Sequence, residues 1–106
     1  MLRIIGLICV AGSVVTQPSF AQSCYEKYYT RSEGLMDDIE DISDEMSTYS
    51  FRSPEYCRLN KLYLRKQNRY IKARINGANC PNSLPERIDW QSELRQNERD
   101  LKAGCN

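Results

Sequence analysis

The chain has 106 residues, with 15 Lys or Arg, 14 Asp or Glu and no His, so its formal net charge is +1 at pH 7. This balance argues against a nucleic-acid-binding protein, because such proteins carry a clear excess of positive charge. The lack of His removes the usual general base of nucleophilic catalysis and a common metal ligand.

Residues 1–21 have the pattern of a cleaved secretory signal peptide. Arg3 supplies the positive start, residues 4–15 are mostly apolar, and residues 19–21 have the small-x-small form of a cleavage site. The apolar run is too short to span a membrane, and no second run follows it. We therefore expect a mature chain of residues 22–106 that forms a single helical domain without a transmembrane segment. It would be periplasmic or secreted, and the absence of an Asn-x-Ser/Thr sequon favours a bacterial source.

The first predicted helix spans about residues 24–48. Ser23 and Glu26 have the spacing of a capping box. Apolar side chains recur at helical spacing along one face, whereas most of the other positions are acidic. The apolar face consists of Tyr28, Leu35, Ile39, Ile42, Met46 and Tyr49.

The second predicted helix spans about residues 54–76. Ser53 and Pro54 form a strong start, and Asn76-Gly77 is a matching stop. Two apolar stripes run along this helix, which predicts two packing partners and makes it the central helix. The first stripe contains Tyr56, Leu59, Tyr63 and Tyr70, and the second contains Cys57, Leu64, Ile71 and Ile75.

Basic residues fill the remaining face of this central helix, within an arc of about 80°. We name the set the basic stripe: Arg58, Lys61, Arg65, Arg69 and Lys72. It is either a solvated face or a binding surface for an anionic partner. The tyrosines that recur every seven residues are likewise either a helix–helix seam or an aromatic ladder for a ligand.

The third predicted helix spans about residues 84–103. Ser83 and Glu86 have the spacing that opens a helix, and Gly104 closes it. Its apolar face is narrow, with Trp90, Leu94 and Leu101 on one line. We therefore expect this helix to pack most weakly of the three against its neighbours.

Four cysteines remain after removal of Cys9 with the signal peptide, and they predict two structural disulfides. A helix of this length separates Cys57 from Cys80 by about 30 Å, whereas a disulfide needs Cα atoms within about 7 Å. Antiparallel neighbours therefore predict the pairs Cys24–Cys80 and Cys57–Cys105. The expected fold class is all-α, a small up-down-up bundle of three helices stapled by two disulfides.

No catalytic residues, cofactor or metal ligands are expected, since the chain has neither a Cys-x-x-Cys pair nor a Gly-rich phosphate loop. The predicted function is non-enzymatic binding of a protein or an anionic envelope component, through Arg58, Lys61, Arg65, Arg69 and Lys72. One alternative is a secreted bacterial effector that acts on a host target. A second alternative is a structural envelope component without a specific ligand, and a third is an enzyme that uses only carboxylates.

Overall fold

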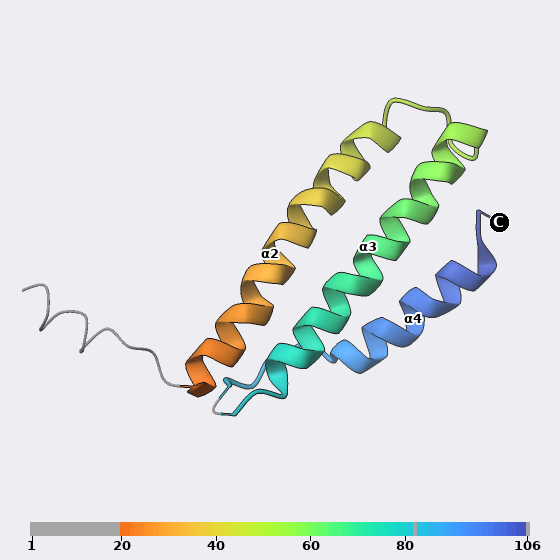
Figure 1. Cartoon of the computed structure of the whole chain (residues 1–106). Coiled ribbons are helices and arrows are strands. Elements are labelled where there is room, and N and C mark those ends of the chain that lie inside the picture. The colour runs from red at the N-terminus through yellow and green to blue at the C-terminus, as the bar shows by residue number, and fades with distance from the viewer. Residues whose placement is uncertain (1–19, 82, 106) are drawn as a thin grey trace, which may run out of the picture.

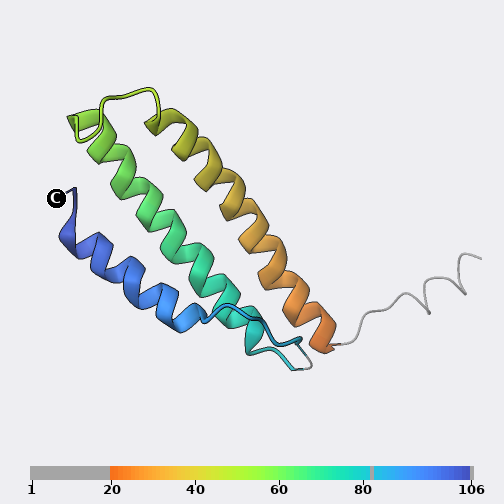
Figure 2. The same cartoon turned by 180° about the vertical axis from the view of Figure 1, so that it is seen from behind.

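The protein consists of three helices, α2 (Phe20–Met46), α3 (Pro54–Ala78) and α4 (Trp90–Ala103). This computed structural model describes residues 20–81 and 83–105, so nearly all of the expected signal peptide lies outside the described residues. In both views of the molecule α3 lies between α2 and α4 (Figures 1 and 2). It contacts both, whereas no close contact joins the described parts of α2 and α4. The predicted all-α architecture with a central second helix is confirmed.

Both predicted disulfides are present. The Cα atoms of Cys24 and Cys80 lie 5.9 Å apart, and those of Cys57 and Cys105 lie 5.5 Å apart. Because α2 and α3 run antiparallel, the first bond ties α2 to the carboxyl-terminal end of α3. The second ties the end of α4 to the amino-terminal end of α3. Each outer helix is therefore fastened to α3 at an opposite end of the molecule.

The start of α3 is the one predicted. The Ser53 hydroxyl accepts a hydrogen bond of 3.2 Å from the backbone N–H of Tyr56, and Pro54 occupies the first turn. The predicted stop at residues 76–77 is wrong, because the helix continues to Ala78 and is capped by Asn79. Gly77 is instead buried in the helix, where an added Cβ would lie 3.4 Å from the Cβ of Tyr28. This is an ordinary van der Waals distance, so Gly77 marks a point where α3 packs against Tyr28 of α2.

The start predicted for α2 is also wrong. The helix begins at Phe20, so Ser23 lies inside it rather than at its cap. At the other end α2 stops at Met46, two residues before the predicted end, and a turn follows in which Thr48 N–H donates to the Glu45 carbonyl. Gly34 does not interrupt the helix.

The start predicted for α4 is wrong by six residues, because the helix begins at Trp90 and not at residue 84. Asp89 caps it by accepting a hydrogen bond of 3.1 Å from the Ser92 backbone. Leu84 and Ile88 therefore lie in the connection before the helix, with exposed fractions of 80% and 51%. At the carboxyl end Gly104 closes the helix with a φ of +70°, as the sequence predicts.

The buried side chains are distributed unequally between the helices. The apolar core comes from α2 and α3, together with Cys80. By contrast, the buried residue of α4 is polar: Asn97 is only 2% exposed. The apolar core residues are Ile39, Ile42, Leu59, Leu64, Ile71 and Ala73.

Two of the recurring tyrosines of α3 contact aromatic rings from other segments. The Tyr70 and Trp90 rings meet edge to face at a centroid distance of 5.8 Å, and Tyr56 meets Phe51 in the same way at 5.2 Å. All three tyrosines, including Tyr63, are half-buried. These contacts agree with a packing seam.

No described helix is long and apolar enough to cross a membrane.

Candidate binding surface

The basic stripe lies along one exposed face of α3. All five of its residues are exposed to solvent. From Arg58 to Lys72 the stripe covers about 20 Å of helix. It follows from the sequence pattern, because residues three and four apart share one side of a helix. The two apolar stripes flank it and face α2 and α4, which leaves the basic side chains uncovered.

The charges of the basic stripe are not neutralised by ion pairs within the described residues. Two ion pairs occur there, Lys66 with Asp38 at 3.2 Å and Arg74 with Glu86 at 3.0 Å. Neither involves the basic stripe. The acidic α2 thus provides one cross-helix partner for α3 and leaves the positive charge of the basic stripe available to another molecule.

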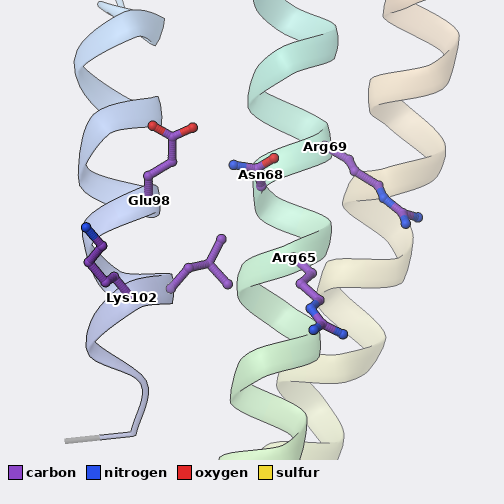
Figure 3. Close-up of a pocket in the computed structure, with 6 residues that line it drawn as sticks. Arg65, Asn68, Arg69, Glu98 and Lys102 are labelled. Carbon is purple, nitrogen blue, oxygen red and sulfur yellow. The ribbon is translucent and has the colours of Figure 1, made fainter.

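A shallow groove of about 570 Å³ lies between α3 and α4, beside the basic stripe. Arg65 and Arg69 line it from α3, and Lys102 and Glu98 line it from α4. Figure 3 shows that the side chains of Arg65 and Arg69 extend toward α2, away from Glu98 and Lys102. The guanidinium groups therefore lean away from the one carboxylate of this groove.

A second groove, of about 370 Å³, lies between α2 and α3 on the other side of the basic stripe. Arg69 lines this groove too, so it lies on the ridge between the two. Lys72 joins it from α3, and Arg31 joins it from α2. No carboxylate is among its lining residues, which are Arg31, Leu35, Arg69, Lys72, Ala73 and Asn76.

Arg31 and Lys102 were not predicted as part of the binding surface. The pattern of α3 alone cannot identify them, because they come from the neighbouring helices. A signal for Arg31 does exist in the disulfide Cys24–Cys80. Arg31 follows Cys24 by seven residues and Ala73 precedes Cys80 by seven, so the antiparallel register places them side by side.

On the opposite face of α3, Arg74 binds the connection between α3 and α4. Its guanidinium pairs with Glu86, which also accepts a hydrogen bond of 2.6 Å from Trp90 Nε1. The guanidinium carbon lies 5.3 Å from the Trp90 ring centroid and 5.8 Å from that of Tyr29 on α2. This cluster joins all three helices, so we assign Arg74 a structural role and not a place in the binding surface.

The environment of this cluster shifts the pKa values of both partners. Burial alone would raise the pKa of Glu86, but the hydrogen bonds from Trp90 and Arg74 and the charge of Arg74 outweigh it and lower that pKa. Burial would likewise lower the pKa of Arg74, but its hydrogen bond and charge interaction with Glu86 raise it. Both groups are therefore charged at neutral pH.

The described residues show neither a metal site nor a free cysteine. Within residues 20–81 and 83–105, no group of three or more Cys, Asp or Glu residues is placed to hold a metal ion. The four cysteines in this range are paired as disulfides. The basic stripe and its two grooves are therefore the surface with the clearest chemical character.

Comparisons with protein-family models, with curated proteins and with solved structures find no match to this chain. The function has to be inferred from the geometry and charge of the basic stripe.

Proposed function

We propose that this is an exported, non-enzymatic binding protein that acts in the periplasm or cell envelope on a macromolecular, anionic partner. The observation that supports it is the row of five exposed cations on α3, none of which forms an ion pair within the described residues. Such a row would attract an acidic protein or an anionic envelope component. Its length of about 20 Å suits an extended partner better than a single small ion.

The rigidity of the scaffold supports the same proposal. The basic stripe lies on the helix that both disulfides hold, so its side chains project from a backbone that is fixed at each end. A rigid surface loses less conformational entropy on binding than a flexible one. The two grooves beside the basic stripe make this face concave on each side of it, so a partner could contact it over more than a flat surface.

The test is a pull-down with the purified, oxidised, exported protein from envelope extract and from host lysate in parallel. The variant reverses two charges at the centre of the basic stripe, Arg65→Glu with Arg69→Glu. The matched control reverses two exposed charges that line neither groove, Arg87→Glu with Arg99→Glu. We expect a partner that wild type and control retain, that the basic-stripe variant loses, and that binds more weakly as salt rises.

Retention of the same partners by all three proteins would overturn the proposal, because the basic stripe would then be a solvated face of a structural component. Retention from host lysate alone would contradict a role in the envelope and favour an effector. Circular dichroism of the three proteins establishes that the substitutions leave the fold intact.

A further inference from the structure

The groove between α2 and α3 concentrates positive charge from two helices around a small hollow. Arg31 projects from α2, and Arg69 and Lys72 project from α3. We propose that this groove binds a phosphate monoester group. The inference deepens the proposed function and rests on it, since the groove shares Arg69 and Lys72 with the basic stripe.

The chemistry of the lining suits phosphate. A guanidinium presents paired N–H donors that match two oxygens of one phosphate, and an ammonium adds a compact point charge. Two arginines and a lysine together could balance the double negative charge of a monoester. No carboxylate lines the groove to compete for these donors. Leu35, which is half-buried, supplies an apolar portion that would contact the carbon-bearing part of the ligand.

The groove between α3 and α4 is the natural comparison, because it is also lined by three cations. There, however, Glu98 contributes a negative charge. Arg69 lines both grooves, and its side chain extends toward α2 rather than toward Glu98 (Figure 3). These observations favour the α2–α3 groove as the site where an anion is held.

Arg31 is also positioned by its neighbours. Its guanidinium carbon lies 5.6 Å from the centroid of the Tyr28 ring, a cation–π arrangement. Tyr28 in turn packs against α3 at Gly77. Tyr28 therefore lies at the α2–α3 interface, and its half-buried ring places an aromatic face beside Arg31 at the edge of the groove.

The experiment measures binding of the exported, oxidised protein to two probes. One is a vesicle of phosphatidylcholine doped with phosphatidic acid, and the other is soluble glycerol 3-phosphate. The test variant is Arg31→Glu with Lys72→Glu. The matched control is Arg65→Glu with Lys102→Glu, which removes one cation of α3 and one of a neighbouring helix from the other groove. Both variants keep Arg69 and have the same net charge.

We expect the test variant to bind at least about tenfold more weakly than wild type, and the control to lose less than about threefold. Arg31→Lys should bind with intermediate affinity, because it keeps the charge but loses the paired donors. Arg31→Gln with Lys72→Gln is the second form of the test variant, should the charge reversal unfold the protein.

Binding to the vesicle alone identifies a lipid headgroup as the source of the phosphate. Binding to both probes, or to glycerol 3-phosphate alone, identifies a phosphate recognised without a membrane.

Two results would overturn the inference. One is that wild type binds neither probe. The other is that the test and control variants lose affinity equally, since the charge of the whole face, and not the groove, would then determine binding. The proposed function survives either result if the pull-down still depends on Arg65 and Arg69. It fails independently if the pull-down finds no partner that depends on the basic stripe.

Discussion

The two interfaces of α3 are built from different chemistry. On the α2 side, both helices contribute buried apolar side chains: Leu59 and Ala73 of α3 are 2% and 3% exposed, and Ile39 and Ile42 of α2 are 7% and 8% exposed. On the α4 side, α3 contributes Leu64, which is 8% exposed and lies near Leu101, but the buried residue of α4 itself is the polar Asn97. Its amide donates to the Leu64 carbonyl and to Gln67 Oε1, both at 3.0 Å, and its oxygen accepts from Asn68 at 2.8 Å.

The two interfaces therefore have different roles: the apolar one mainly stabilises the fold, and the polar one fixes how α4 is aligned along α3. Apolar burial is roughly proportional to area and has little direction, so the apolar side chains between α2 and α3 contribute free energy without fixing a single alignment. The disulfide Cys24–Cys80 fixes that alignment instead. A buried amide is costly when its partners are missing, by about 1–3 kcal/mol. The α4 interface therefore has one favourable register, in which Asn97 reaches all its partners. The cluster around Glu86 and the disulfide at Cys105 hold the two ends of α4 in that register.

The largest expected effect comes from removing one disulfide at a time. The sequence separations are 56 and 48, so the chain-entropy model assigns each bond a similar stabilisation of roughly 4 kcal/mol. The structural consequence should differ. Without Cys57–Cys105 (Cys57→Ser with Cys105→Ser), α4 should exchange its amide hydrogens rapidly while α2 and α3 stay protected, because the apolar core remains.

Hydrogen exchange resolved by helix, together with denaturant unfolding, provides the measurement. The matched control is Cys24→Ser with Cys80→Ser, which should lower the global free energy of unfolding and expose α2 and α3 together. Equal loss of protection in all three helices for both variants would show that the interfaces unfold as one unit. The α2 and α4 interfaces of α3 would then not be energetically separable.

The next effect tests the apolar interface. Leu59→Ala removes most of a side chain that is 2% exposed and leaves a cavity. We expect a loss of about 3 kcal/mol in the free energy of unfolding, from lost burial and the cavity. Leu62→Ala, on the same helix but 38% exposed, is the control and should cost less than about 1 kcal/mol. Similar losses for the two variants would mean that the core is not centred on Leu59.

The polar interface is tested by Asn97→Ala. The change leaves a carbonyl and two amide side chains of α3 without their partner, and we expect a loss of about 2 kcal/mol. Gln96→Ala is the control, because its exposed side chain bonds only within α4 in the described structure, to Asp100 and Arg99. Hydrogen exchange should place the loss of Asn97 in α4. A loss no larger than that of the control would show that the buried amide does not hold the register.

The features predicted correctly from the sequence depend on local spacing. The start of α3 follows from Ser53 and Pro54, and the disulfides follow from the helix lengths and the antiparallel order of neighbouring helices. The start of α4 was predicted at Ser83, whereas Asp89 caps the helix. In the structure Glu86 lies in the connection before the helix, and its contacts with Arg74 and Trp90 are tertiary contacts that local spacing does not contain.

Other features depend on the register between helices, which local patterns do not contain. Asn97 was not expected to be buried, since a hydrophobic pattern counts only apolar positions. The basic stripe was predicted because it lies on one helix. The groove that it shares with Arg31 required the antiparallel alignment that Cys24 and Cys80 impose.

The smallest expected effect is also the one that depends on pH. Because the folded state lowers the pKa of Glu86 below its usual 4.5, its ionised form stabilises the fold. This contribution is complete above the pKa of the unfolded chain and is lost as the pH falls through the lower folded value. Glu86→Gln keeps an acceptor for Trp90 but removes the charge, so it should cost about 1 kcal/mol at pH 7. The difference between wild type and variant should shrink below pH 4.5, and hydrogen exchange should place it at the start of α4. A difference that stays constant on acidification would mean that the ion pair with Arg74 does not contribute to holding α4.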